Sequence, residues 1–326
     1  MRAVVLESHG GPEVLTIRDV PAPSAGPEEA VVDIAATALN RADVLQRLGL
    51  YPGPPMDHEI PGLEFSGTVV SAGARATIWN PGDHVMGIVG GGAYAERIAV
   101  HERQLLRVPA SVDLCDAAAI PEVWITAWDA LVLQGGLTSG RTALVHAGAS
   151  GVGTAAIQLC KSINAQVIVT ASAGKVEACR DLGADLAVDY GTEDFVARVR
   201  EFTEGRGVDV VLDVIGGDYV DRNVDALTVG GRIIQVGVMG GGGGGLNVGK
   251  LLPKRAAIIG TVLRARPIEQ KIEVTQRFAS EVLPLFDRGV LRPVIDRRFP
   301  LGEIGAAHER MQANANIGKI VVDVNP

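Results

Sequence analysis

Cysteine, aromatic side chains and clustered basic residues are all scarce in this chain of 326 residues. The three cysteines, Cys115, Cys160 and Cys179, have no Cys-x-x-Cys partner, so neither a disulfide framework nor a structural zinc site is expected. The net charge is −8 and no long run of Lys or Arg offsets it, which argues against a nucleic-acid partner. No apolar run approaches the roughly 18 residues of a membrane span. Because no signal-peptide pattern follows Met1 either, we expect a cytoplasmic protein without a membrane partner.

Glycine and small apolar residues, by contrast, are abundant. The chain holds 41 glycines and is 47% hydrophobic and 21% charged, a composition typical of a turn-rich α/β protein. Its length allows two domains with separate cores. The pattern of strands and helices should therefore change where one domain gives way to the next.

Residues 1–120 are predicted to form a compact β domain, because short β-rich runs alternate with Gly and Pro turns. These runs include a strand over 93–100, and a helix is expected over 124–133. From Thr142 the pattern becomes strand–helix–strand, which is typical of a parallel sheet with crossover helices. Its predicted strands cover residues 143–146, 167–170, 187–189, 208–213, 232–236 and 256–263. After a predicted helix over 267–286 the tail is β-rich again, so residues 264–326 are expected to complete the first domain around a doubly wound α/β domain of residues 121–263.

The stretch from Thr142 to Lys161 carries the clearest functional signal. A strand leads into a small-residue turn and then a helix, and Gly148, Ser150 and Gly153 give a G-x-S-x-x-G pattern. Such a turn lets backbone N–H groups and a helix N-terminus approach the pyrophosphate of a dinucleotide, and the serine hydroxyl can donate to phosphate. A hydrolase nucleophile elbow is excluded because Val152 stands where that motif needs glycine. The residues predicted to line the turn are Ala147, Gly148, Ser150, Gly151, Val152 and Gly153.

The type of cofactor is predicted from the end of the second strand of this array. An NAD site usually has an acid there, about 20 residues past the glycine motif, that binds the ribose 2′-hydroxyl. Residues 170–175 contain no acid, whereas Ser172 and Lys175 could bind a 2′-phosphate and Tyr190 could add its hydroxyl. NADPH is therefore favoured over NADH. The alternative is that Lys175 only faces solvent in a first helical turn.

Further cofactor contacts are expected at the carboxyl ends of the later strands, where parallel sheets form their binding crevice. The candidates are Gly216 after the fourth strand, Val238, Met239 and Gly240 after the fifth, and Leu263 at the end of the sixth. The six-glycine run 240–245 lies at this end too, either as part of the site or as a loop without function.

The order of these parts and several motifs resemble the medium-chain dehydrogenase/reductase superfamily, in which a GroES-like catalytic domain is interrupted by a Rossmann domain. The motifs are Gly11–Glu13, Ala38–Asp43, Gly62–Gly67, Ala118–Pro121, the glycine turn and Asn316–Lys319, spread over essentially the whole chain. Zinc alcohol dehydrogenases of this superfamily place a Cys at Asn40 and a His at Leu63, and carry a four-Cys lobe that is absent here. Leucine cannot bind a metal, so no catalytic metal is expected. The chain is thus similar to the zinc-free quinone oxidoreductase branch and, within it, to the tumour-suppressor-inducible NADPH quinone oxidoreductases.

The resemblance implies hydride transfer from NADPH to a quinone or a conjugated enone, with no metal because such an acceptor is already electrophilic. Tyr51 is the predicted proton donor to the developing oxyanion, and Asn40 is expected to bond the ribose or the substrate. Thr126 matches a position beside the nicotinamide, and Asn316 is a further predicted cofactor contact. The alternatives are that Tyr51 is a packed loop aromatic and that Asn40 is a helix N-cap.

Two other functions fit the same residues. Reduction of a 2-enoyl thioester or another activated alkene is hardly separated from quinone reduction by the sequence. An NADPH-binding sensor with weak catalysis is the alternative outside enzymes. A short-chain dehydrogenase is excluded, because no tyrosine is followed four residues later by lysine. The sixth strand, 256–263, is apolar and would promote aggregation if its edge were bare, so we expect it to pair across a homodimer, as the resemblance also implies.

Overall fold

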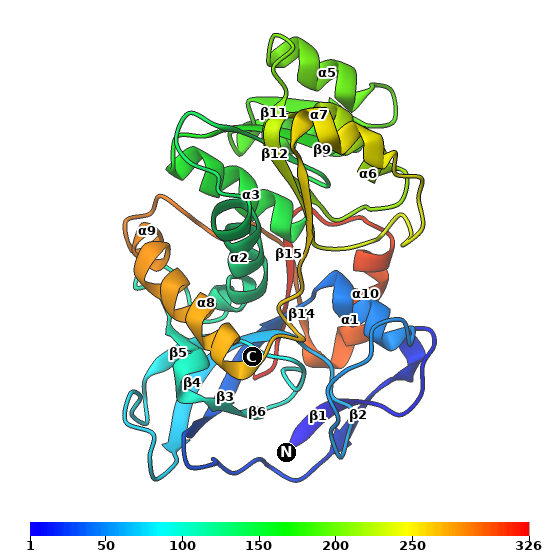
Figure 1. Cartoon of the computed structure of the whole chain (residues 1–326). Coiled ribbons are helices and arrows are strands. Elements are labelled where there is room, and N and C mark those ends of the chain that lie inside the picture. Colours follow the sequence, from blue (N-terminus) through cyan, green and yellow to red (C-terminus); the bar gives the residue numbers. More distant parts are fainter. Residues whose placement is uncertain (326) are drawn as a thin grey trace. The chain divides into compact units, whose positions relative to one another are not determined.

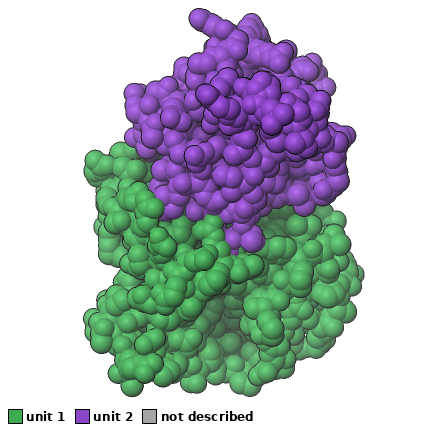
Figure 2. Space-filling view, viewed as in Figure 1, with its two compact units in different colours: residues 1–125, 264–326 green, residues 126–263 purple. Residues whose placement is uncertain are grey.

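The computed structural model describes residues 1–325, whose two compact units are coloured separately in Figure 2. Unit 1 comprises residues 1–125 and the segment that begins at Arg264, and unit 2 comprises residues 126–263. Each unit has its own sheet and its own hydrophobic core. Unit 1 is therefore discontinuous in sequence, because unit 2 is inserted between its two segments.

Unit 1 is built around a seven-stranded, mostly antiparallel sheet (Figure 1). Its strands are β3 (Glu29–Ala38), β4 (Glu64–Ala72), β5 (His84–Ile88), β6 (Arg97–His101), β7 (Leu105–Arg107), β14 (Ile295–Pro300) and β15 (Lys319–Asp323). The order is β14-β15-β3-β4-β5-β7, with β6 also paired to β3. Strands β1 (Arg2–Leu6) and β2 (Leu15–Asp19) form a separate antiparallel pair. Because β3 pairs with β15, the C-terminal segment is an integral part of the main sheet.

The strand expected over 93–100 is regular only over Arg97–His101. The residues before it change partners: the N–H of Tyr94 donates to the carbonyl of Pro61, and the Tyr94 carbonyl accepts from the N–H of Val4. Two residues later, the carbonyl of Glu96 accepts from Ile34 in β3. This segment therefore passes from β1 to β3 and forms no continuous ladder with either strand.

Helices α1 (Arg41–Arg47), α8 (Ile268–Glu281), α9 (Leu283–Asp287) and α10 (Ile304–Gln312) belong to unit 1. The single helix expected over 267–286 is broken at Val282, because Pro284 lacks an N–H and its ring clashes with a carbonyl of the preceding turn. The helix expected over 124–133 begins earlier, as α2 (Pro121–Trp128), and continues as a wider π-helix over Asp129–Gln134. Pro121 suits this start because the first helical N–H has no intrahelical partner.

Unit 2 contains a six-stranded parallel sheet of order β10-β9-β8-β11-β12-β13. The strands are β8 (Thr142–Val145), β9 (Gln166–Ala171), β10 (Leu186–Asp189), β11 (Val208–Asp213), β12 (Leu227–Gln235) and β13 (Ala257–Gly260). Helices α3 (Gly151–Ser162), α4 (Val176–Asp181), α5 (Phe195–Phe202), α6 (Tyr219–Ala226) and α7 (Leu251–Lys254) connect them. In chain order the strands run 3-2-1-4-5-6, which is the doubly wound Rossmann order, and the predicted α/β fold class is confirmed. The order reverses between β8 and β11, where a ligand crevice is expected.

The central strands of this sheet are near-continuous apolar runs, as burial on both faces requires. Leu144, Ile168 and Val211 are fully buried and belong to one core cluster with Phe195 and Val199 of α5. Full burial of such a side chain contributes about 1.5–3 kcal/mol. The core therefore holds the carboxyl ends of β8, β9 and β11 firmly in place.

Candidate functional site

The turn after β8 is shaped for close approach by a ligand. Ala147 has a left-handed backbone, with φ of 57°, and starts the turn. A Cβ atom on Gly148 would lie 2.6 Å from the Cβ of Val169 in β9, and one on Gly153 would collide with the carbonyl of Ala147. Glycine at both positions lets the turn lie flat against β9 and against the start of α3. This small-residue cradle fits the pyrophosphate of a dinucleotide.

Ser150 has a role in this turn that the sequence pattern alone leaves open. Its side-chain oxygen accepts the N–H of Gly153 at 3.0 Å, so Ser150 is the N-cap of α3. The hydroxyl proton remains available for donation. The N–H groups of Gly151 and Val152, at the first two helical positions, have no partner within the helix by geometry. Together with the helix dipole they form an anion-binding end.

The residues predicted to select the nucleotide lie at the carboxyl ends of β9 and β10. Ser172 precedes a 3-10 turn, Ala173–Lys175, in which the N–H of Lys175 donates to the Ser172 carbonyl at 2.8 Å. The N–H of Gly148 donates to the carbonyl of Thr170 at 2.8 Å, which fixes this turn beside the glycine cradle. Tyr190 directly follows β10 and is 53% exposed. Hydroxyl and ammonium groups thus stand where an NAD site has an acid.

The loops after β11 and β12 pack on one another. Gly216 and Gly217 have φ of 68° and 54°, a conformation that favours glycine. The N–H of Gly240 donates to the carbonyl of Ile215 at 2.7 Å, and a Cβ atom on Gly244 would collide with the backbone of Gly217. The six-glycine run is therefore packed in part against the loop after β11. Val238 and Met239 remain exposed beside it.

In unit 1, Asn40 is buried directly before α1 and its amide is engaged at both ends. Its Nδ2 donates to Glu64 Oε1 at 2.9 Å, and its Oδ1 accepts from Lys319 Nζ at 2.7 Å. The backbone N–H of Asn40 donates to Asp43 Oδ2 at 2.8 Å, which caps the helix. Asn40 thus holds the N-cap position that the sequence offered as an alternative, within a buried polar cluster.

Lys319 and Glu64 form a buried ion pair that sequence reasoning did not find. Lys319 is 2% exposed and Glu64 is 0% exposed, and their Nζ and Oε1 atoms lie 2.6 Å apart. Lys319 Nζ also donates to the carbonyl of Leu39 at 2.5 Å, and Glu64 Oε2 accepts the N–H of Glu122 at 2.8 Å. Both ions are therefore fully hydrogen-bonded. The only sequence signal was the motif position of each residue, since 255 positions separate them.

Leu63 is buried beside Glu64 and offers no ligand atom. Within residues 1–325, no three His, Cys, Asp or Glu side chains are grouped closely enough to hold a metal ion.

Tyr51 lies half-buried in the loop after α1, under a guanidinium group. The Arg264 guanidinium carbon is 4.8 Å from the centre of the Tyr51 ring. Arg264 Nε donates to the carbonyl of Gly90 at 2.7 Å, and Nη2 donates to Gln46 Oε1 at 2.8 Å. Arg264 was not among the residues predicted for the site. In the structure it fixes the loop that carries Tyr51.

Burial controls the protonation of this part of unit 1. It raises the pKa of Tyr51, against the opposing effect of the Arg264 charge, so the phenol keeps its proton at neutral pH. Burial also raises the pKa of Asp43 to about 6, although the Asn40 backbone hydrogen bond and the charge of Lys319 act in the opposite direction. Protonated Tyr51 can donate a hydrogen bond to an anionic oxygen.

The remaining predicted residues are Thr126, Leu263 and Asn316. Thr126 and Leu263 are the first and last residues of unit 2. Thr126 is buried, as is Asn316 of unit 1, whose Nδ2 donates to the carbonyl of Gly318 at 2.7 Å.

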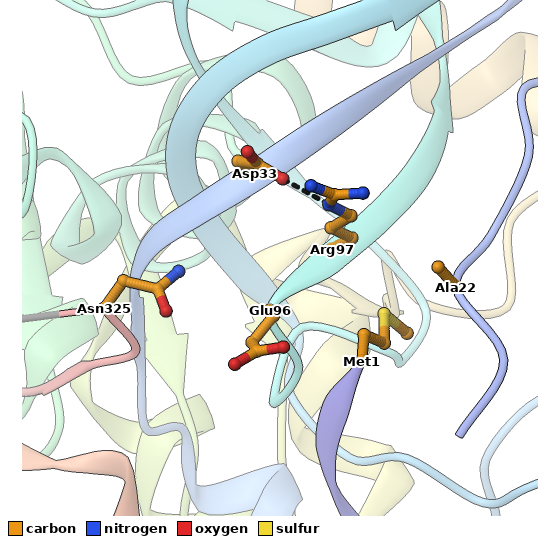
Figure 3. A pocket seen from close by; sticks show the side chains of 6 residues that line it. All are labelled: Met1, Ala22, Asp33, Glu96, Arg97 and Asn325. Carbon is orange, nitrogen blue, oxygen red and sulfur yellow. Dashed lines mark hydrogen bonds and ion pairs between the residues drawn. The ribbon is translucent and has the colours of Figure 1, made fainter. Parts of the chain in front are cut away.

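A surface hollow of about 410 Å³ in unit 1 contains none of the predicted site residues (Figure 3). It is lined by Met1, Ala22, Asp33, Glu96, Arg97 and Asn325. Its charged groups are paired, since Arg97 Nε lies 2.5 Å from Asp33 Oδ1 and Glu96 pairs with Arg2.

In the described part of the chain, no helix combines the length and the apolar character needed to cross a membrane.

Comparison with known proteins agrees with this geometry. Residues 26–110 match the family described as alcohol dehydrogenase GroES-like domain, and residues 151–280 match the family described as zinc-binding dehydrogenase. A quinone oxidoreductase of Pseudomonas aeruginosa is 33% identical over 323 residues, covering 98% of this chain and 99% of the relative. The human synaptic vesicle membrane protein VAT-1 homolog is 30% identical over 345 residues, covering 100% of this chain and 87% of that protein.

Two solved structures show the same relationship. Escherichia coli quinone oxidoreductase complexed with NADPH has a TM-score of 0.90 at 29% identity, covering 99% of this chain and 100% of that one. The JamJ enoyl reductase has a TM-score of 0.90 at 27% identity, covering 99% of both chains. The chain therefore belongs to the medium-chain dehydrogenase/reductase superfamily, as an oxidoreductase of the quinone oxidoreductase type.

Proposed function

We propose that this protein reduces a quinone with NADPH and without a metal ion. The observation that carries the proposal is the glycine cradle after β8, which continues into an acid-free turn holding Ser172 and Lys175. On this proposal, unit 2 is the Rossmann cofactor domain and unit 1 is the GroES-like catalytic domain. The similarity to an NADPH-complexed quinone oxidoreductase supports the same choice.

The residues of unit 2 divide the nucleotide between them. Backbone N–H groups at Gly151 and Val152 would hold the pyrophosphate, and the Ser150 hydroxyl would donate to it. Ser172, Lys175 and Tyr190 would bind a 2′-phosphate through one ammonium and two hydroxyl groups. Gly216, Val238, Met239 and Gly240 would line the loops after β11 and β12. Asn40, Thr126, Leu263 and Asn316 stay predicted cofactor contacts.

When bound, NADPH supplies the hydride for the reduction. The chain itself must supply a proton and must hold the acceptor. Tyr51 carries a proton at Oη and would donate it to the oxygen on which negative charge develops. Arg264 restrains the Tyr51 ring by its contacts with Gly90 and Gln46, and its charge stabilises the phenolate left after donation. A quinone needs no further polarisation, which fits the apolar Leu63 in this unit.

The cofactor assignment is tested with Lys175→Ala. We expect the KM for NADPH to rise about tenfold or more while the KM for NADH stays unchanged. The reason is that only NADPH carries a 2′-phosphate, which would lose its contact with the Lys175 ammonium. Lys161→Ala is the matched control, since Lys161 pairs on the surface of the same unit with Asp185. Equal effects of Lys175→Ala on both cofactors would refute the 2′-phosphate site.

The proton donor is tested with Tyr51→Phe, which removes the hydroxyl and keeps the ring. We expect kcat for an ortho-quinone to fall by roughly 10²-fold, the usual contribution of a general acid. An unchanged rate would exclude Tyr51 as the donor. Stoichiometric zinc found by elemental analysis would overturn the metal-free reaction.

A second candidate function is reduction of 2-enoyl thioesters or other activated alkenes, and the similarity to an enoyl reductase structure favours it. A panel of quinones, enones and enoyl thioesters, each followed by NADPH oxidation, separates the two. Tight NADPH binding with low turnover on every acceptor would instead indicate a sensor.

We also propose that the protein is a homodimer through β13. This strand pairs with β12 along one side, and the apolar side chain of Val262 just beyond it is exposed. An unpaired edge of this kind is a template for another copy. Light scattering coupled to size exclusion should give twice the mass of one chain, and Ile258→Lys should give a monomer. A monomeric wild-type protein would contradict the proposal.

A further inference from the structure

Beneath the cofactor-facing turns of unit 2 lies a hydrogen-bonded network of buried polar side chains, called here the polar network. His146, Asp213 and Asn223 are 0% exposed, and Thr170 is 1% exposed. They come from the ends of β8, β9 and β11 and from α6, so the polar network crosses the point where the strand order reverses. No part of the proposed reaction uses these groups directly. Four buried polar residues in one line nevertheless require a physical reason, since each must be satisfied within the protein.

Asp213 determines the direction of every hydrogen bond in the polar network. The Asp213 carboxylate only accepts, so Asn223 Nδ2 donates to Asp213 Oδ2 at 2.9 Å. Asn223 Oδ1 is then an acceptor, which places the imidazole proton on His146 Nε2, 2.7 Å away. His146 Nδ1 is left as an acceptor and receives the Thr170 hydroxyl at 3.0 Å.

The surroundings of His146 keep this arrangement neutral and rigid. Its ring packs edge-on against Phe195 and Tyr219, with centroids 5.0 and 4.9 Å away. The Arg222 guanidinium lies over Phe195, 4.3 Å from the ring centre. Burial lowers the pKa of His146, and the charge of Arg222 acts in the same direction, against the attraction of Asp213. The imidazole therefore carries a single proton.

Both ends of the polar network reach the turns that face the cofactor. At one end, the Thr170 carbonyl accepts the N–H of Gly148 at 2.8 Å. At the other end, Asp213 Oδ1 accepts the N–H groups of Ile215 and Gly216 at 2.6 and 3.0 Å. His146 itself directly precedes the glycine cradle. One continuous set of hydrogen bonds thus connects the turns after β8, β9 and β11.

We propose that His146, as the neutral Nε2–H tautomer, is a positioning residue that holds these three turns in register for the dinucleotide. This inference rests on the nucleotide site proposed above and adds residues that touch no ligand. Removing the Thr170 hydroxyl from the polar network should loosen the 172–175 turn relative to the glycine cradle. NADPH affinity should then fall even though every residue that contacts the cofactor is intact.

The test compares two isosteric substitutions in neighbouring parallel strands. Thr170→Val removes the hydroxyl that donates to His146. Thr142→Val is the matched control: Thr142 is equally buried but lies at the amino end of β8, where its hydroxyl contacts Gln166 and Arg206. We expect Thr170→Val to raise the NADPH dissociation constant, measured by nicotinamide fluorescence, roughly fivefold, as loss of a hydrogen bond of about 1 kcal/mol implies. Thr142→Val should leave it unchanged, and Thr170→Ser, which keeps the hydroxyl, should restore it.

Nitrogen NMR of the wild-type imidazole provides a measurement that does not depend on any variant. The shifts of His146 should show a proton on Nε2 and a bare Nδ1 at neutral pH, with or without NADPH. A proton on Nδ1, or equal affinities for the Thr170→Val and Thr142→Val variants, would overturn the positioning role while leaving the proposed function intact. Failure of the wild-type protein to bind NADPH at all would instead refute the proposed function and this inference with it.

Discussion

Replacement of Lys319 by Met should be among the most destabilising single changes in unit 1. The side chains have similar length, so the apolar stem keeps its packing while the ammonium is lost. Three acceptors lose the hydrogen bond from the ammonium, namely Glu64 Oε1, Asn40 Oδ1 and the carbonyl of Leu39, which lie 2.5–2.7 Å from Nζ. Most of the cost comes from Glu64, which is left as a buried charge without a counterion. Removal of one partner from such a pair costs about 3–5 kcal/mol.

The loss should be traceable to the charge of Glu64. A buried carboxylate without a counterion is costly, because burial penalises the charge. Adding Glu64→Gln to Lys319→Met removes the charge and should recover part of the lost stability at pH 7.

Urea unfolding followed by tryptophan fluorescence measures this effect. With an m value of about 2 kcal/mol per molar urea, a loss of 4 kcal/mol lowers the midpoint by about 2 M. Lys161→Met is the control: the pair of Lys161 with Asp185 is close, at 2.8 Å, but has side chains that are 42% and 25% exposed. That change should cost less than about 1 kcal/mol. A Lys319→Met midpoint equal to that of Lys161→Met, or no recovery of stability on adding Glu64→Gln, would refute the reasoning.

Three further predictions concern other residues. The folded-state pKa of Asp43, about 6, lies above the ordinary value of 3.8, so between these pH values the folded protein holds a proton that the unfolded chain has lost. The free energy of unfolding, measured relative to Asp43→Asn, should therefore be highest below pH 3.8 and should fall by about 3 kcal/mol as the pH rises through 6. Parallel urea titrations at pH 4 and 7 that show no such difference would contradict this prediction. Gly148→Ala should weaken NADPH binding at least tenfold in a fluorescence titration, because the new methyl group meets Val169, and unchanged affinity would show that the turn can move away. Burial raises the pKa of Cys160 to about 12. A thiol reagent at pH 7.5 should therefore label the half-buried Cys115 first and reach Cys160 only on unfolding. Rapid labelling of Cys160 in the native protein would refute its burial.

The strands of unit 2 could be predicted from the sequence because each is a short apolar run bounded by glycine or polar turns. The predicted strand over 208–213 has the same bounds as β11, and the glycine cradle lies between the strand and the helix expected to flank it. The break at Val282 was missed because the apolar period continues through Pro284, although proline carries the reason for the break.

The candidate site in unit 1 was less predictable, because distant segments meet in it. Lys319 contacts Asn40 across 279 positions, and Arg264 contacts Gln46 across 218 positions. No periodicity or spacing within one segment reveals such contacts. Asn40 shows the consequence: its motif position predicts a substrate or ribose contact, which stays a prediction, but gives no sign of the hydrogen bonds of its amide with Glu64 and Lys319.

The insertion of unit 2 into unit 1 also sets an order of folding during synthesis. Unit 2 is continuous, and all its strands have left the ribosome once residue 263 has emerged. Strand β6 pairs with β3 from Glu29 to Asp33, but the part of the same edge from Ala36 to Ala38 must still wait for β15. Until Lys319 arrives, the carboxylate of Glu64 has no counterion and the sheet of unit 1 lacks β15. Contacts of such long sequence separation close slowly, so unit 1 should remain the vulnerable part of the nascent chain, with an open strand edge exposed to aggregation.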